Sequence, residues 1–133
     1  MLKIESLRSL TMSRHVDKPW GYEIIWAETS KYVGKVLFIE TGKRLSLQYH
    51  EIKDESILVI QGKLSLELEN ELGIIETHEI NEGEGRRIPT GRRHRFTAIE
   101  DCELIEVSTP ELDDVVRIED DFGRAPEKDT DNG

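Results

Sequence analysis

Cysteine is nearly absent from this chain of 133 residues, in which Cys102 is the only one. A single cysteine excludes a disulfide within the chain, and its thiol has no second cysteine that would resolve an oxidised form. Cys102 lies in the apolar run CELIEV. We therefore interpret it as a core or strand residue and not as a nucleophile.

Long apolar runs are absent as well. The opening segment, MLKIESLRSL, lacks the apolar stretch of a secretion signal, and no segment reaches the roughly 18 apolar residues of a membrane-spanning helix. A chain of this length can bury the core of one domain without disulfide bonds. We expect a single-domain protein that is soluble and cytoplasmic.

Basic residues are outnumbered, because 18 lysines and arginines stand against 28 acidic residues, for a formal net charge of −10. Nucleic acids and anionic membranes bind net basic surfaces, so we exclude both as general partners. A cluster of arginines is nevertheless either a solvated strand face or a clamp for one small anion. Of its members, we expect Arg87 and Arg93 to point inward and bind substrate. The cluster comprises Arg86, Arg87, Arg92, Arg93 and Arg95.

The sequence is rich in short runs that alternate apolar and polar residues, as half-buried strands do. Glycine, proline or acidic residues separate most of these runs, and turns are expected at Gly62 and at 70–73. Many short strands at this spacing predict an all-β, antiparallel sandwich or barrel. The runs are YEIIWA, KVLFIET, RLSLQYH, SILVIQG, KLSLELEN, GIIETHEI, HRFTAIE, CELIEVST and DVVRIED.

The two ends of the chain differ from its middle. Residues 1–17 contain the weakly amphipathic KIESLRSL, which is consistent with an arm or with an extra strand or helix. Residues 125–133 are polar and carry proline and glycine, so we expect a disordered tail. The domain itself is expected to span 18–124.

Two stretches carry side chains that bind metals. In the first, Gln48 and His50 are two residues apart and share one face of a strand, and Glu55 follows across a short bend. In the second, His94 begins a strand directly after the rigid bend that Pro89 and Gly91 form. Two imidazoles, a carboxylate and an amide oxygen suit one divalent ion such as Zn, Mn, Fe, Co or Ni with open coordination positions.

The spacing of these residues resembles the two motifs of the cupins. Residues 42–62 follow the pattern Gly-x5-Gln-x-His-x4-Glu-x6-Gly, and residues 83–94 follow Gly-x5-Pro-x-Gly-x2-His. This resemblance implies a single-domain cupin fold, that is, a double-stranded β-helix or jelly-roll barrel. It also implies that Gln48, His50, Glu55 and His94 are the metal ligands.

Three segments narrow the resemblance to the cupin domain of type II mannose-6-phosphate isomerases. These are LSLQYH, the early KPWGYEIIW and the late DDVVRIEDDFGR, so the likeness runs from about 18 to 124. It covers the isomerase-like domain, and we expect no nucleotidyltransferase domain. The late segment adds Arg124 as an expected substrate contact, and His50 and Glu55 are the expected catalytic residues, Glu55 as a base only if the ion holds it loosely.

The sequence departs from this family beside the metal ligands. The family usually has Arg-Ser-Glu-His-Trp where this chain has KDESI, so that Ser56 and Ile57 replace a histidine and a tryptophan. After His94 the family tends to have Arg-x-x-Asn, and here the sequence is RFTA. Phe122 stands in place of a tyrosine. These departures concern the expected sugar contacts and leave the metal ligands intact.

Three functions are consistent with these observations. The first is a metal-dependent aldose–ketose isomerase acting on a sugar phosphate, with mannose 6-phosphate as the substrate that the resemblance implies. The second is another metal-dependent cupin enzyme, such as an iron-dependent dioxygenase, an epimerase or a lyase on a small metabolite. The third is a cupin that binds sugars without catalysis. Small cupins have exposed sheet edges, so we also expect a homodimer.

Overall fold

The computed structural model describes residues 13–126, which form eleven β-strands and no helix. All strand pairs are antiparallel, and the strands belong to two sheets. The larger sheet has the order β1 (Arg14–Lys18), β2 (Gly21–Glu28), β3 (Val33–Ile39), β10 (Cys102–Ser108), β5 (Glu55–Gln61) and β8 (Gly85–Ile88). The smaller sheet has the order β11 (Val116–Glu119), β4 (Leu47–Tyr49), β9 (His94–Ala98), β6 (Lys63–Glu69) and β7 (Ile75–Asn81).

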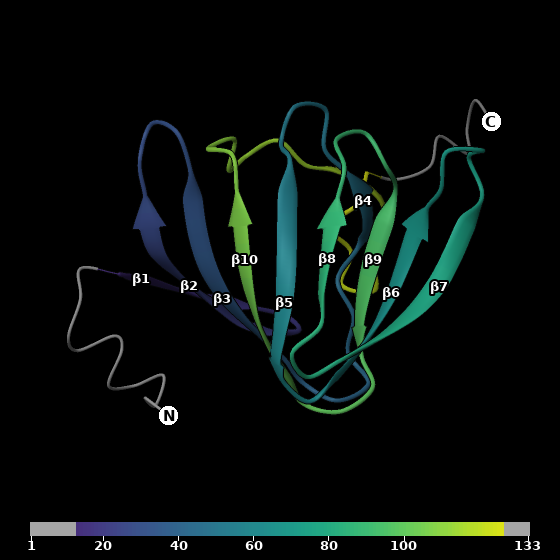
Figure 1. The fold of residues 1–133 in the computed structure, drawn as a ribbon, viewed down its shortest axis with the longest axis horizontal. Helices are drawn as coiled ribbons and strands as arrows, with labels where there is room; N and C mark the ends of the chain where they lie inside the picture. Colours follow the sequence, from purple (N-terminus) through teal and green to yellow (C-terminus); the bar gives the residue numbers. More distant parts are fainter. Residues whose placement is uncertain (1–12, 127–133) are drawn as a thin grey trace.

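The fold is the expected all-β, antiparallel one, and each of the nine alternating runs contains a strand. Figure 1 shows the strands of the larger sheet passing from β1 at one side to β8, with β9, β6 and β7 of the smaller sheet continuing beyond it. The side chains between the sheets form one apolar cluster. That cluster comprises Trp20, Leu37, Ile39, Ile57, Val59, Leu64, Leu66, Ile80, Ile88, Phe96, Ala98, Cys102 and Leu104.

The interior of this sandwich has two ends of different chemistry. Four strands contribute residues that face the interior. At one end of the sandwich these residues are charged or polar, and we call it the polar end; at the other they are apolar, and we call it the apolar end. Because β10 runs antiparallel to both β3 and β5, its residues change character in the opposite order along the chain. The inward-facing residues are Lys35, Leu37 and Ile39 on β3; Glu55, Ile57 and Val59 on β5; His94, Phe96 and Ala98 on β9; Cys102, Leu104 and Glu106 on β10.

The turn at Gly62 joins β5 to β6 at the apolar end. Gly62 has a φ of +87°, and a Cβ atom built there would lie 2.0 Å from the carbonyl oxygen of Asp101. Only glycine fits this left-handed conformation against the neighbouring backbone. The turn that was expected at 70–73 is also present, and there the Asn70 side chain accepts hydrogen bonds from the backbone N–H groups of Leu72 and Ile74.

The expected N-terminal arm divides at the limit of the described residues. Residues 14–18 form β1, which pairs with β2 at the edge of the larger sheet. The rest of that arm, residues 1–12, and positions 127–133 of the expected tail lie outside the described residues. Within 13–126, no helix has the length and apolar character that a membrane span requires.

Candidate functional site

His50, Glu55 and His94 meet at the polar end of the interior. His50 follows β4, Glu55 is the first residue of β5 and His94 is the first residue of β9, so both sheets contribute. All three side chains are buried. The Nε2 atom of His94 lies 3.3 Å from Oε1 of Glu55, and Nε2 of His50 lies 3.7 Å from Oε2. One potential ligand atom from each residue lies within 4.8 Å of the others.

The backbone fixes which ring nitrogen of each histidine faces this cluster. Nδ1 of His50 donates to the carbonyl oxygen of Asp114, and Nδ1 of His94 donates to that of Arg92 at 2.9 Å. A carbonyl only accepts hydrogen bonds, so each Nδ1 carries a proton, and in the neutral ring, the form that binds metal, each Nε2 presents a lone pair. Both Nε2 atoms are buried without a hydrogen-bond partner. Two lone pairs and a carboxylate repel one another unless a cation lies among them, and this arrangement fits a divalent metal ion.

The electrostatics of the cluster favour the ionised form of Glu55. Burial raises the pKa of this carboxyl group, but the contacts with His50 and His94 and the charge of Lys53 outweigh burial and hold the pKa well below its usual value. Burial lowers the pKa of His50, and the nearby Glu55 carboxylate and the Asp114 carbonyl reverse that effect and raise it. Glu55 therefore stays a carboxylate, which is the form that binds metal.

The loop between His50 and Glu55 is held by Asp114, which lies shortly before β11. Its carboxylate accepts hydrogen bonds from the backbone N–H groups of Ile52 at 2.7 Å, Lys53 at 2.9 Å and Glu51 at 3.1 Å. The same residue supplies the carbonyl that orients His50. Asp114 thus positions both the loop and a candidate ligand.

The bend before β9 holds the same loop from the other side. The backbone N–H of Gly91 donates to the carbonyl of His50 at 2.8 Å, and the Thr90 hydroxyl donates to the carbonyl of Lys53 at 3.2 Å. Gly91 has a φ of +82°, which glycine adopts without strain. The Pro-x-Gly bend therefore joins the two motif segments physically.

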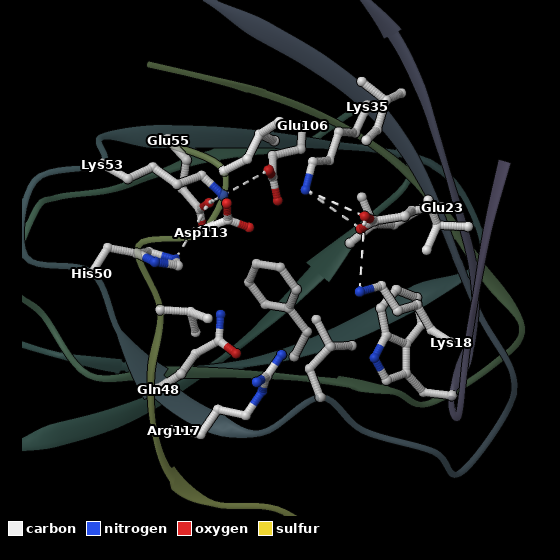
Figure 2. Close-up of a pocket in the computed structure, with 18 of the residues that line it drawn as sticks. Lys18, Glu23, Lys35, Gln48, His50, Lys53, Glu55, Glu106, Asp113 and Arg117 are labelled. Atoms are coloured by element: carbon white, nitrogen blue, oxygen red, sulfur yellow. Dashed lines mark hydrogen bonds and ion pairs between the residues drawn. The ribbon is translucent and has the colours of Figure 1, made fainter. Parts of the chain in front are cut away.

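A cavity of about 250 Å³ opens beside the cluster, and one of its walls is charged. Figure 2 shows that lysines and glutamates alternate along this wall. Nζ of Lys53 lies 2.9 Å from Glu55 and 3.1 Å from Glu106, while Lys35 pairs with Glu23 at 3.5 Å. Burial and the charge of Glu55 raise the pKa of Glu106, whereas the two carboxylates outweigh burial and raise the pKa of Lys53. Lys53 is therefore a permanent cation beside the cluster.

The family model described as "Mannose-6-phosphate isomerase C-terminal" matches residues 6–120 of the chain. This match covers most of the sequence. The chain belongs to the mannose-6-phosphate isomerase C-terminal family.

Curated relatives share this domain. The chain is 33% identical over 132 residues to the mannose-1-phosphate guanylyltransferase ManC of Salmonella typhimurium, covering 92% of this chain and 26% of that protein. It is 30% identical over 119 residues to the xanthan biosynthesis protein XanB of Xanthomonas campestris, covering 86% of this chain and 24% of that protein. The chain thus spans about a quarter of the length of these relatives.

Solved structures confirm the cupin fold. KdgF from a Halomonas species superimposes with a TM-score of 0.66 at 24% identity, covering 75% of this chain and 90% of that chain. Oxalate decarboxylase from Bacillus subtilis gives a TM-score of 0.70 at 14% identity, covering 80% of this chain and 30% of that chain.

The structure brings only some of the expected site residues of this isomerase-family domain to the cavity. Gln48 and Arg124 line it together with His50 and Glu55. One lone pair of the Gln48 amide oxygen is used by the Ser46 hydroxyl, which donates a hydrogen bond to it. Arg124 is held by Asp120 through hydrogen bonds of 2.8 and 2.9 Å.

Arg87 and Arg93, which we expected to point inward, are not among the residues that line the cavity. Arg87 lies on the edge strand β8, where its exposed side chain forms a two-point ion pair with Asp54. Arg93 binds Glu69 and the backbone carbonyl of Gly73. Each guanidinium is satisfied by groups outside the cavity, which is why neither turns toward it.

The departures from the family pattern at Ser56 and Ile57 also lie outside the cavity lining. Ile57 faces the apolar end and belongs to the buried cluster. Ser56 alternates with its neighbours Glu55 and Ile57 along β5, so it points to the opposite face of the sheet. Neither substitution removes a polar group from the cavity of this protein.

Sequence reasoning missed eight charged residues that line the cavity. The available signal was a charge on the apolar face of a strand. Glu106 lies on the same face of β10 as Cys102 and Leu104, and Lys35 lies on the same face of β3 as Val33 and Leu37. A charge in such a position is rarely buried unless it is paired or functional. The missed residues are Arg14, Lys18, Glu23, Lys35, Lys53, Glu106, Asp113 and Arg117.

Proposed function

We propose that this protein is a metal-dependent isomerase that interconverts an aldose phosphate and a ketose phosphate, with mannose 6-phosphate as the substrate that the family description suggests. The observation that carries the proposal is the convergence of two unpartnered imidazole Nε2 atoms on the Glu55 carboxylate, in a buried position beside a cavity. Membership of the isomerase family supports this choice among the metal-dependent cupin reactions.

The residues that would hold the ion are His50, Glu55 and His94, with Gln48 as a candidate fourth ligand. When bound, a divalent ion such as Zn, Mn, Fe, Co or Ni supplies Lewis-acid polarisation of a substrate carbonyl or hydroxyl oxygen. Manganese has a precedent in this fold, because oxalate decarboxylase from Bacillus subtilis contains Mn(II) centres. The role of His50 and Glu55 in catalysis is then to fix the reacting end of the substrate.

The isomerisation also needs a base, and Asp113 is the carboxylate that meets the requirement. Glu55 is occupied by two imidazoles and Lys53, and Glu106 is held by Lys53. Asp113 lines the cavity, has no hydrogen bond or ion pair to any residue within 13–126, and its carboxylate is directed inward in Figure 2. In our proposal it removes the proton from the carbon beside the carbonyl and returns it to the neighbouring carbon, while a hydroxyl proton passes between the two oxygens.

Lys53 has a supporting role in this scheme. Its ammonium group is fixed between two carboxylates at the side of the cluster, so its position does not depend on the substrate. A preorganised cation near oxygens that become negative lowers the free energy of the charged state without reorganisation. We therefore assign Lys53 to charge stabilisation and not to proton transfer.

The test is turnover of mannose 6-phosphate to fructose 6-phosphate by protein reconstituted with each of the five metals. Activity should disappear with a chelator and return with metal. The variant Asp113→Asn should keep its metal and lose most of kcat, because amide nitrogen and oxygen do not take up the proton. If none of the five metals gives turnover, the isomerase assignment for this sugar is rejected. Full activity of Asp113→Asn would reject Asp113 as the base.

A second candidate is an oxygen-using iron enzyme. The observation that favours it is the ligand set itself, because two histidines and one carboxylate with open positions also suit ferrous iron. Oxygen consumption by the iron-loaded protein in the presence of a small metabolite would favour this candidate, whereas chelator-sensitive isomerase activity under anaerobic conditions would favour the first.

A further inference from the structure

Most of the cations around the cavity already have carboxylate partners. Six cationic and four acidic side chains line it, so the cavity of this acidic protein is itself net cationic. Five of the six cations form ion pairs, so a carboxylate already offsets part of their charge. The pairs are Arg14 with Glu28, Lys18 and Lys35 with Glu23, Lys53 with Glu55 and Glu106, and Arg124 with Asp120.

Arg117 on β11 is the exception among the cavity cations. Its guanidinium has no ion pair or hydrogen bond to any residue in the described range 13–126, and its Nε atom is buried without a partner. Arginine stays charged at every physiological pH. Leaving a buried donor of a charged group unpaired costs free energy, so this guanidinium is placed to bind an anion.

Strand register places Arg117 at a fixed position relative to the metal cluster. Arg117 is directly opposite Gln48 on β4, and Gln48 is directly opposite His94 on β9. Residues directly opposite one another in neighbouring strands point to the same face of a sheet. At the usual strand spacing, the Cα atoms of Arg117 and His94 are about 10 Å apart. Figure 2 shows the Arg117 and Gln48 side chains reaching into the same cavity.

We propose that Arg117 binds the anionic group, a phosphate or a carboxylate, of a small substrate whose reacting end lies at His50, Glu55 and His94. The planar guanidinium binds either anion through two parallel hydrogen bonds. Gln48 lies between Arg117 and His94 in this row of facing residues. The position of the reacting end at the metal cluster rests on the proposed function, whereas the contact with the anion rests on Arg117 alone.

The first experiment measures binding of inorganic phosphate to the metal-loaded protein by isothermal titration calorimetry. Arg117→Gln should weaken binding by about 10-fold or more, because a hydrogen-bonded charge pair is lost. Arg117→Lys keeps the charge without the planar donors, so its affinity for phosphate should lie between those of the wild type and Arg117→Gln. The matched control is Arg87→Gln, which removes an exposed arginine outside the cavity and should bind phosphate as the wild type does. Circular dichroism checks that each variant is folded.

The second experiment distinguishes the two sources of the anion. Mannose 6-phosphate, glucuronate and neutral mannose are titrated into the wild type and into Arg117→Gln. Binding of mannose 6-phosphate that depends on Arg117 identifies a phosphate, and binding of glucuronate that depends on Arg117 identifies a carboxylate. Equal binding of every anion to the wild type and Arg117→Gln, or no anion binding by the wild type, would overturn the proposal.

These outcomes separate this inference from the isomerase assignment. If Arg117-dependent anion binding occurs without isomerase turnover, the proposed reaction fails and the anion site remains. If turnover occurs and Arg117→Gln leaves KM for mannose 6-phosphate unchanged, the isomerase remains and the anion site fails. A rise in KM with little change in kcat in Arg117→Gln would support both.

Discussion

Along β5, Ile57 and Val59 lie among the apolar side chains between the sheets, while Glu55, two residues earlier on the same face, meets His50 and His94. The same change occurs on β9, where His94 precedes Phe96. The apolar end gains free energy from burial alone, whereas each charge at the polar end costs free energy unless a partner offsets it. The two ends therefore have different tasks, although they share the same strands: one stabilises the fold, and the other is the proposed site of the ion and the ligand.

The largest effect is expected when the candidate metal ligands at the polar end are removed. In the double variant His50→Ala/His94→Ala, two of the three converging ligands are lost, so metal content measured by mass spectrometry should fall to background. The matched control is His78→Ala on β7, a more exposed histidine outside the cavity, which should retain the wild-type metal content. Equal metal in the double variant and the wild type would refute the assignment of the ligands.

Truncation at the apolar end should have the converse effect. Leu104→Ala should lower the free energy of unfolding by about 2–5 kcal/mol, because a buried leucine leaves a cavity in the cluster. The control is Val107→Ala on the same strand, which is half exposed and should change stability by no more than about 0.5 kcal/mol. Urea denaturation measures both. Loss of metal by folded Leu104→Ala protein would show that the two ends are not separable.

A third test examines the loop between His50 and Glu55. Asp114→Ala removes the acceptor for three backbone N–H groups, and the loosened loop should weaken metal affinity by about 10–100-fold. Competition with a chromogenic chelator measures this affinity. The neighbouring variant Asp113→Asn should bind metal as the wild type does, since Asp113 holds no part of the loop. Unchanged affinity in Asp114→Ala would remove Asp114 from its positioning role.

The smallest effect concerns one ion pair beside the cavity and appears only in acid. The Arg124 guanidinium lowers the pKa of Asp120 from 3.8 to about 2. Because the folded-state pKa is depressed, the pair contributes stability above the unfolded pKa, and this contribution is lost as pH falls through the folded one. The difference in unfolding free energy between the wild type and Asp120→Asn should be constant at neutral pH, shrink as pH falls below the unfolded pKa, and disappear below the folded pKa of about 2. A difference that does not shrink over this range would contradict the pairing.

Much of the fold could be predicted from the sequence because alternation is a local signal. The nine alternating runs each contain a strand, and the spacing of the two motifs indicated that His50, Glu55 and His94 would meet. The strand β8 was missed because its sequence, GRRI, has no alternation and pairs only with β5 at the sheet edge. Local patterns carry little information about such a strand, since its partner determines it.

The proposed substrate contacts were harder to predict because they depend on long-range pairing. Arg87 and Arg93 sit in the conspicuous cluster of arginines, yet Asp54 and Glu69 bind them outside the cavity. Arg117 has no basic neighbours in the sequence, and only its register with Gln48 brings it to the cavity. The density of charge along a sequence therefore did not indicate which arginine lies beside the site. Pairing partners, which appear only in the folded chain, decided it.

The hydrogen bond from the His50 ring to the Asp114 carbonyl also has a consequence for the order of events during synthesis. The two residues are 64 positions apart, so the ring is oriented only after most of the domain has emerged from the ribosome. The strands of the apolar end, up to and including β10, precede Asp114 in the chain and become available to one another earlier. We expect a growing chain to acquire a hydrophobic nucleus first and to become competent for metal only as its last strand docks.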